Sequence, residues 1–225
     1  MSHFSIAIDG PSGAGKSTLA KQLAEKLGFL YVDTGAIYRT VGLYVARQGK
    51  DCGRAEEVEP LLPDIKIDLT YGEDGLQHMV LCGEDVTAAI RENEVSRYAS
   101  EVSALPAVRD FLLEMQRALA RTRSVIMDGR DIGTVVLPDA DVKIYLTASA
   151  NQRAIRRQKE LEEKGTVLPF QQVLREIVER DYADEHREIA PLRRAEDAVL
   201  VDTTELDLEE SLEALETLVK ERLPL

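Results

Sequence analysis

A glycine-rich motif near the N-terminus constrains this chain more than any other feature. Residues 10–17 read GPSGAGKS and fit the pattern G-x-x-x-x-G-K-[ST]. The short apolar segment Phe4–Ile8 precedes the motif, and Lys16–Leu27 follow with leucines and alanines at helical spacing. A glycine loop between a strand and a helix cradles phosphate groups with its backbone N–H groups. The motif therefore predicts a loop for nucleotide phosphates, with Lys16 on the β and γ phosphates and the Ser17 hydroxyl on Mg²⁺.

Apolar and amphipathic segments alternate along most of the chain. After the glycine loop, Phe29–Val32 predicts a second strand, residues 33–35 a turn, and Ala36–Gln48 a helix. Gly28 is expected to end the first helix. Further helices are expected at Pro106–Arg121, Asn151–Glu163, Phe170–Glu185 and from Asp207 onward, where Glu210 would complete a capping box. Further strands are expected at Val125–Met127, Val142–Leu146 and Ala198–Val201. This alternation is typical of an α/β fold with a mainly parallel sheet, and we expect a single domain over residues 1–225.

Two segments depart from this alternation. Within residues 60–100, apolar and charged residues alternate at 65–69, residues 72–75 resemble a hairpin turn, and Gln77–Leu81 predicts a short strand. We expect a small antiparallel insert there. Residues 164–166, Lys-Gly-Thr, predict a mobile connection between two helices.

Composition limits the classes of partner. There are 28 basic and 41 acidic residues, a net charge of −13, which argues against a nucleic-acid binder. An anionic substrate then requires a local group of cations. Cys52 and Cys82 have neither the spacing of a zinc site nor that of a disulfide framework. No apolar run is long enough to span a membrane and no secretory leader pattern is present, so we expect a cytoplasmic protein.

Three strings carry a resemblance that covers essentially the whole chain. They read IDGPSGAGKS at 8–17, DTGAIYR at 33–39 and DGRDIGT at 128–134. Together they resemble the bacterial cytidylate kinase family. The resemblance implies a P-loop kinase fold with a five-stranded parallel sheet of order 2-3-1-4-5 flanked by helices. It also implies that residues 60–100 form the nucleoside-monophosphate-binding insert, that residues 153–168 form a lid over ATP, and that the γ-phosphate of Mg-ATP is transferred to CMP or dCMP.

The resemblance also implies which residues contact the donor and the acceptor. The expected ATP-binding residues are Gly10, Ser12, Gly13, Ala14, Gly15, Lys16, Ser17, Thr18, Arg156 and Arg157. The expected acceptor-binding residues are Asp33, Thr34, Tyr38, Arg39, Ser100, Arg109, Arg130, Asp131, Arg180, Asp184 and Arg187. Within this set, Ser100, Arg109 and Asp131 are expected to read cytosine. The Asp131 carboxylate would accept from its exocyclic amine, whereas uracil would present a carbonyl.

The expected catalytic residues are Lys16, Arg130, Arg157 and Arg180. No general base is needed, because the attacking phosphate oxygen is already ionised. Three carboxylates that follow predicted strands, Asp9, Asp33 and Asp128, are candidates to orient Mg²⁺-bound waters, and Asp33 and Asp128 could equally hold neighbouring arginines.

Several of these residues have plainer readings. Arg39 and Arg109 could be solvated helix charges, Tyr38 could be core packing, and Ser100 has no special spacing. Arg180, Asp184 and Arg187 have the spacing of one helical face, which also fits a surface ion-pair cluster. The lid arginines Arg153, Arg156 and Arg157 could form a basic surface beside glutamates. The string DEHR at 184–187 also departs from many relatives, which leaves the details of ribose recognition open.

Two other functions remain open at this stage. A P-loop kinase could use a smaller acceptor such as a shikimate-like acid, although the insert offers more surface than a small acid needs. A nucleotide-gated binding protein would bind ATP without turnover. In each case we expect small-molecule ligands, no nucleic-acid polymer, no membrane and a monomer.

Overall fold

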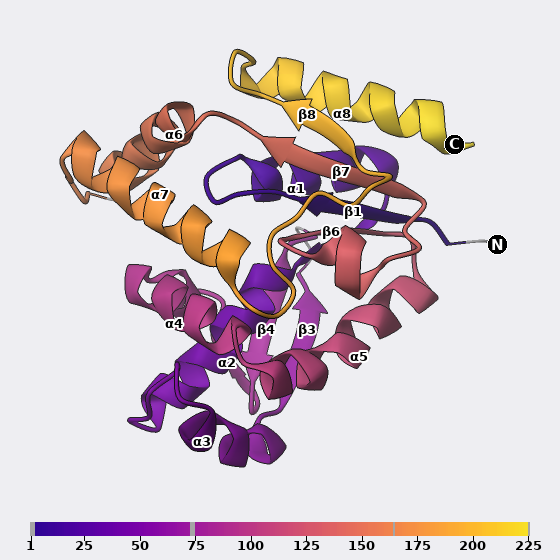
Figure 1. Cartoon of the computed structure of the whole chain (residues 1–225). Coiled ribbons are helices and arrows are strands. Elements are labelled where there is room, and N and C mark those ends of the chain that lie inside the picture. The colour runs from indigo at the N-terminus through magenta and orange to yellow at the C-terminus, as the bar shows by residue number, and fades with distance from the viewer. Residues whose placement is uncertain (1–2, 73–74, 164, 225) are drawn as a thin grey trace. The chain divides into compact units, whose positions relative to one another are not determined.

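Five strands form the main sheet in the order β2-β6-β1-β7-β8. The computed structural model describes residues 3–72, 75–163 and 165–224 (Figure 1). The five strands are β1 (Ser5–Asp9), β2 (Leu30–Asp33), β6 (Val125–Gly129), β7 (Val142–Thr147) and β8 (Val199–Asp202). The pairs β1–β6, β1–β7 and β7–β8 are parallel. Numbered along the chain without the strands of the smaller sheet, the order is 2-3-1-4-5, so the predicted sheet is confirmed.

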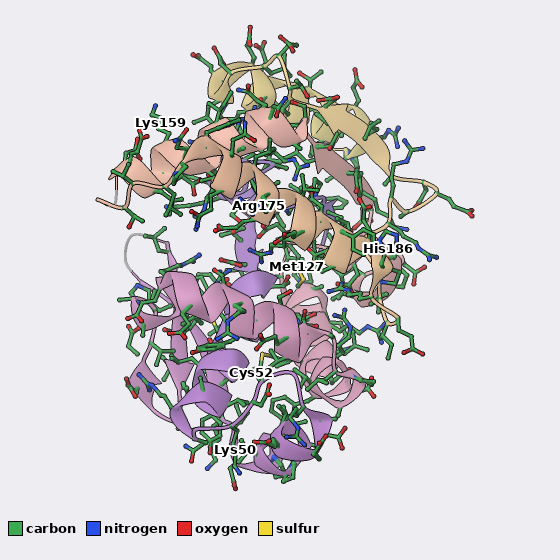
Figure 2. The ribbon with its side chains drawn as sticks, turned by 60° about the vertical axis from the view of Figure 1, so that its left-hand side comes forward. Lys50, Cys52, Met127, Lys159, Arg175 and His186 are labelled. Atoms are coloured by element: carbon green, nitrogen blue, oxygen red, sulfur yellow. The ribbon has the colours of Figure 1, made fainter. Side chains whose placement is uncertain are left out.

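The chain divides into two compact units. The first comprises the residues up to Tyr31 and from Thr122 onward, and the second runs from Val32 to Arg121. The two cysteines are free, and the buried one, Cys52, lies in the second unit (Figure 2). None of the helices in the described residues is both long and apolar enough to cross a membrane.

The core of the first unit joins the sheet to two helices, α1 (Lys16–Leu27) and α8 (Leu208–Arg222). Leu23 of α1 and Leu215 of α8 are fully buried against Ile6 and Ile144 of the sheet. Both helix ends follow the sequence signals. Gly28 ends α1 in a left-handed conformation, with φ 66°. Asp207 and Glu210 form the expected capping box at the start of α8.

A second helix pair in this unit consists of α6 (Ala150–Glu163) and α7 (Phe170–His186). They pack together through a small apolar cluster that includes Ala154, Leu161, Val173 and Ile177. The predicted connection at 164–166 includes residue 164, which lies outside the described residues. One turn of π-helix, Ile132–Val136, follows β6 and has no periodic signal in the sequence.

The second unit combines helices with a small antiparallel sheet. Its strands β3 (Ile67–Tyr71), β4 (Gln77–Leu81) and β5 (Glu84–Asp85) are adjacent in that order. Its helices are α2 (Thr34–Arg47), the short α3 (Ala55–Val58), α4 (Asn93–Ser103) and α5 (Pro106–Thr122), with 3₁₀ turns at Glu59–Asp64 (η1) and Ala89–Arg91 (η2). Helix α2 packs against α4, and the turn η2 contacts both.

Two expectations for this unit need correction. Residues 33–35 are not a turn, because Asp33 caps α2 with a carboxylate that accepts from the Ala36 N–H, so the helix starts at Thr34. The antiparallel sheet is present but fills only part of residues 60–100. The C-terminal part of this segment belongs to helix α4, whose apolar residues Val95 and Val102 are buried at helical spacing. The expected hairpin turn at 72–75 includes residues 73–74, which lie outside the described residues.

Candidate active site

The glycine loop, residues 10–15, connects β1 to α1 in the first unit. Gly10 has φ 151°, and a Cβ there would lie 1.9 Å from the Leu146 carbonyl oxygen of β7, so no side chain fits. Gly15 has φ 87° and is the N-cap of α1. The loop thus leads directly into a helix N-terminus, where backbone N–H groups favour an anion. The strand, loop and helix predicted from the motif are confirmed.

Lys16 is buried behind this loop. Its Nζ donates to the Pro11 carbonyl oxygen at 2.8 Å. Loss of hydration lowers the pKa of Lys16 to about 7, and the positive charge of Arg130 adds to that decrease. A bound phosphate would oppose both effects and favour the charged ammonium.

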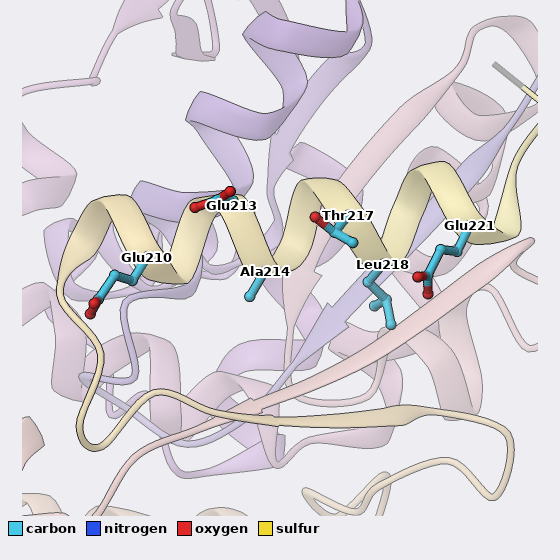
Figure 3. A pocket seen from close by; sticks show the side chains of 6 residues that line it. All are labelled: Glu210, Glu213, Ala214, Thr217, Leu218 and Glu221. Atoms are coloured by element: carbon cyan, nitrogen blue, oxygen red, sulfur yellow. The ribbon is translucent and has the colours of Figure 1, made fainter.

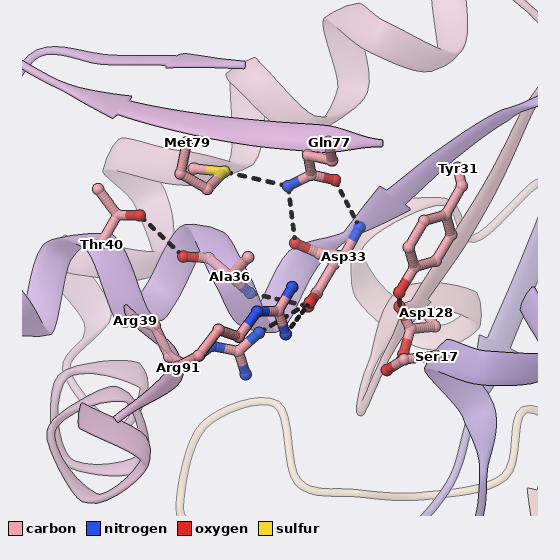
Figure 4. A network of polar contacts seen from close by, with 10 residues as sticks. All are labelled: Ser17, Tyr31, Asp33, Ala36, Arg39, Thr40, Gln77, Met79, Arg91 and Asp128. Carbon is pink, nitrogen blue, oxygen red and sulfur yellow. Dashed lines mark hydrogen bonds and ion pairs between the residues drawn. The ribbon is translucent and has the colours of Figure 1, made fainter. Parts of the chain in front are cut away.

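Ser17 and Asp128 provide the oxygen ligands that suit Mg²⁺. The Ser17 hydroxyl donates to Asp128 Oδ2 at 2.8 Å, and the Tyr31 hydroxyl donates to Asp128 Oδ1 at 2.9 Å (Figure 4). No group of three or more acidic, histidine or cysteine side chains in the described residues could hold a metal by itself. Mg²⁺ at a nucleotide typically needs only one or two protein oxygens beside phosphates and waters, so the residues present fit the ion.

The Asp9 carboxylate accepts hydrogen bonds from the backbone of the segment after β6. Its Oδ1 accepts from the Ile132 N–H at 2.8 Å and its Oδ2 from the Gly133 N–H at 2.7 Å. Burial raises the pKa of Asp9 to about 6 against the lowering effect of these two hydrogen bonds. Asp9 therefore holds the segment after β6, which carries Arg130 and Asp131.

Two arginine–carboxylate pairs lie among the candidate site residues of the first unit. Arg130 Nε donates to Asp184 Oδ2 at 2.7 Å, and Arg187 Nη2 lies 3.4 Å from Asp131 Oδ1. Burial alone would raise the pKa of Asp184, but Arg130 and the charges of two further arginines lower it overall. Arg180 is one of these two.

The expectation of one shared helical face is wrong for Arg187. Helix α7 ends at His186, and Arg187 follows it with extended backbone, φ −63° and ψ 142°. Its Nε donates to the Ala190 carbonyl oxygen at 2.6 Å. The segment after the helix, rather than helical periodicity, places Arg187 beside Asp131.

The three arginines of α6 have distinct environments. Arg153 is buried, and its guanidinium donates to the Ser12 carbonyl oxygen of the loop at 3.0 Å and pairs with Asp181 of α7 at 2.6 Å. Arg156 donates to the Thr203 carbonyl oxygen at 2.7 Å. Arg157 pairs with Glu160 at 3.0 Å and is about one-third exposed, with 32% of its side chain accessible. Arg153 is therefore not part of a solvated basic surface, one of the two readings considered for it, and it links the glycine loop to α7.

A second group of site residues lies in the second unit, at the N-terminus of α2. The Asp33 carboxylate caps the helix and accepts from Arg39 Nη2 at 2.7 Å. It is also 3.1 Å from Arg91 Nη1, a residue that none of the motifs contained (Figure 4). Asp33 thus holds arginines, one of the two roles considered for it. Thr34 is buried directly after it.

The residues expected to read a base are also in this unit. The Arg109 guanidinium lies 5.5 Å from the centre of the Tyr38 ring, and its Nη1 donates to the Ser103 carbonyl oxygen at 3.1 Å. Arg109 is buried, with 7% exposure, so it is not a solvated helix charge. Ser100 is in α4, one turn before Ser103, whose hydroxyl donates to the Ser100 carbonyl oxygen.

A groove on the first unit lies along α8 and contains none of these residues (Figure 3). It is lined by Glu210, Glu213, Ala214, Thr217, Leu218 and Glu221. Three carboxylates in so small a lining make it unsuitable for a phosphate compound.

A family model and the curated relatives point to the same family. A family model described as Cytidylate kinase matches residues 6–221. The chain is 51% identical over 215 residues to the cytidylate kinase of Caldicellulosiruptor saccharolyticus, covering 95% of this chain and 94% of that protein. It is 48% identical over 217 residues to the cytidylate kinase of Thermosipho melanesiensis, covering 96% and 97%. A crystal structure of an uncharacterized protein from Eubacterium ventriosum matches with a TM-score of 0.52 at 12% identity, covering 98% of this chain and 100% of that one, a likeness of fold alone.

Proposed function

The chain belongs to the cytidylate kinase family, and on that premise we propose that it transfers the γ-phosphate of Mg-ATP to CMP or dCMP, giving ADP and CDP or dCDP. The contact between Ser17 of the glycine loop and Asp128 at the end of β6 carries the proposal on the structural side. It supplies a hydroxyl and a carboxylate next to the helix N-terminus that favours phosphate.

The donor is held by the first unit. The backbone N–H groups of Gly10 and of residues 12–18 bind the β and γ phosphates together with the Lys16 ammonium. Arg156 and Arg157 of α6 contact ATP from the lid, residues 153–168. Ser17 and Asp128 are the residues that would hold Mg²⁺. The ion supplies charge neutralisation on the transferring phosphate.

The acceptor phosphate is bound by guanidinium groups and hydroxyls. In the second unit these are Thr34, Tyr38 and Arg39, with Asp33 as their support. Arg130 and Arg180 of the first unit neutralise the charge that develops during transfer, and Asp184 fixes Arg130 through a 2.7 Å bond. Since the attacking oxygen is ionised, positioning and charge neutralisation lower the barrier without a base.

Cytosine is read by Asp131, Arg109 and Ser100. The Asp131 carboxylate accepts from the exocyclic amine, and Arg187, 3.4 Å away, orients that carboxylate. A uracil carbonyl at the same place would face the carboxylate, so UMP is disfavoured. The insert, residues 60–100, encloses the acceptor.

The cell compartment and assembly are part of the same proposal. Two free cysteines agree with a reducing cytoplasm. A net charge of −13 favours a monomer, and the partners are CMP, dCMP and ATP rather than nucleic acid or membrane.

The test is ADP formation with Mg-ATP and, in separate reactions, CMP, dCMP, UMP, AMP and shikimate. We expect turnover with CMP and dCMP and much less with UMP. Lys16→Ala should lose the transfer while retaining the circular dichroism spectrum of the wild type. Turnover with shikimate and with no other acceptor would mean that the acceptor is a small acid rather than CMP or dCMP. ATP binding without any turnover would indicate a binding protein.

A further inference from the structure

One buried carboxylate in the second unit forms ion pairs with two arginines. Asp33 Oδ2 accepts from Arg39 Nη2 at 2.7 Å and lies 3.1 Å from Arg91 Nη1 (Figure 4). Asp33 Oδ1 accepts from the Ala36 N–H at 2.8 Å. Burial alone would raise the pKa of Asp33, but Arg39 and Arg91 outweigh it and lower it. The two guanidinium groups therefore converge on one point at the start of α2.

Three features of the surrounding structure keep this arrangement in place. The Gln77 side chain of β4 accepts from the Asp33 N–H at 2.8 Å and donates to the Asp33 carbonyl oxygen at 3.3 Å. Gly35 makes room for the ion pair, since a Cβ there would lie 3.1 Å from Arg39 Nη1. Ile90 is fully buried and anchors the turn η2, at whose end Arg91 lies.

The cluster has more positive charge than its internal partner neutralises. Two guanidinium groups and one carboxylate sum to +1, in a protein whose net charge is −13. The Nε of Arg39 is buried and has no hydrogen-bond partner among the described residues. Arg91 keeps 52% of its side chain exposed, so the side chain is accessible to a ligand from solvent. An unsatisfied buried donor beside surplus positive charge indicates a site for an anion.

We infer that Arg91 is a second arginine for the acceptor phosphate, which it binds together with Arg39, and that Asp33 holds both guanidinium groups in place before the substrate arrives. This inference rests on the proposed function, because it takes the anion to be the phosphate of CMP. Arg91 lies outside all three strings that carried the family resemblance. Its link to the site comes from the fold of the second unit.

The experiment measures binding without ATP, so that it does not depend on turnover. CMP and cytidine, which lacks the phosphate, are titrated calorimetrically into the wild type, Arg91→Ala and Arg91→Gln. The glutamine variant keeps a polar N–H donor, on a side chain two bonds shorter than arginine, but removes the charge. Arg97→Ala is the matched control, since Arg97 is 62% exposed and pairs with Glu101 at 3.0 Å in the same unit.

We expect both Arg91 variants to bind CMP at least about tenfold more weakly than the wild type, with cytidine binding unchanged. Arg97→Ala should bind CMP like the wild type. Unchanged CMP affinity in the Arg91 variants, or an equal loss for CMP and cytidine, would show that Arg91 only supports the fold and would overturn the inference. Absence of CMP binding to the wild type would instead remove the proposed function.

Discussion

Asp9 carries a charge that is costly for this protein to bury. Its pKa is raised from 3.8 to about 6 by burial. As the pH falls from about 7 towards 4, the folded protein takes up a proton at Asp9 that the unfolded chain takes up only at lower pH. The contribution of Asp9 to the free energy of unfolding therefore increases over this range, by on the order of 3 kcal/mol. Above about pH 6 the full cost of the buried charge is present.

The comparison of the wild type with Asp9→Asn isolates this effect. We expect the free energy of unfolding of the wild type, relative to the variant, to increase as the pH is lowered from about 7.5 to 4.5. Urea unfolding at a series of pH values measures it. Parallel pH profiles for the two proteins would contradict the prediction.

Asp128 and Tyr31 offer a second test at the scale of single residues. Asp128→Asn removes the charge next to Ser17, so we expect kcat to fall about 10- to 100-fold and the Mg²⁺ concentration at half-maximal activity to rise. Tyr31→Phe removes only the hydroxyl that donates to Asp128 at 2.9 Å, and its effect should be smaller. Steady-state rates over a Mg²⁺ titration measure both. Equal effects of the two substitutions would mean that the charge of Asp128 is unimportant.

Helix α2 and helix α4 approach each other at Gly42. A Cβ there would lie 2.7 Å from Tyr98 Cβ and 2.9 Å from the Tyr98 carbonyl carbon. On an exposed helix, alanine in place of glycine stabilises, but here it forces the two helices apart. We expect Gly42→Ala to destabilise the protein by about 1–3 kcal/mol in chemical unfolding. A higher free energy of unfolding for Gly42→Ala than for the wild type would contradict the prediction, because it would mean that α2 and α4 accommodate the methyl group without loss of stability.

Elements with local signals were predictable, and elements set by packing were not. The glycine loop, the end of α1 at Gly28 and the capping box of α8 depend on residues close in sequence, and all three are confirmed. Helix α4 was missed because the alternating residues just before it suggested continued strands. The helical spacing of Val95 and Val102 was the signal that could have identified it.

The site shows the same division between local and distant contacts. The P-loop lysine and serine follow from one motif. The pairing of Arg153 with the Ser12 carbonyl oxygen joins residues 141 positions apart, and no periodicity in the sequence reports it. Arg91 is likewise far from Asp33 in sequence. Only the packing of η2 on α2 and α4 relates them.

At the scale of the whole molecule, the charge balance bears on association between copies of the chain. A net charge of −13 on 225 residues opposes contact between copies. We expect light scattering at low ionic strength to give one species of 25.0 kDa. A stable mass of twice that value would contradict the monomer.

The path of the chain also affects synthesis. The hydrogen bond between Ser17 and Asp128 joins residues 111 positions apart, and β1 pairs with β6 and β7, which come after the whole second unit. At the usual pace of a ribosome, roughly 6 to 22 s pass between the two residues. During that time β1 has neither of its neighbours, while the second unit, contiguous in sequence, can complete its own contacts. Translation therefore favours a nascent chain in which the second unit folds before Asp128 is available to accept the hydrogen bond from Ser17 of the glycine loop.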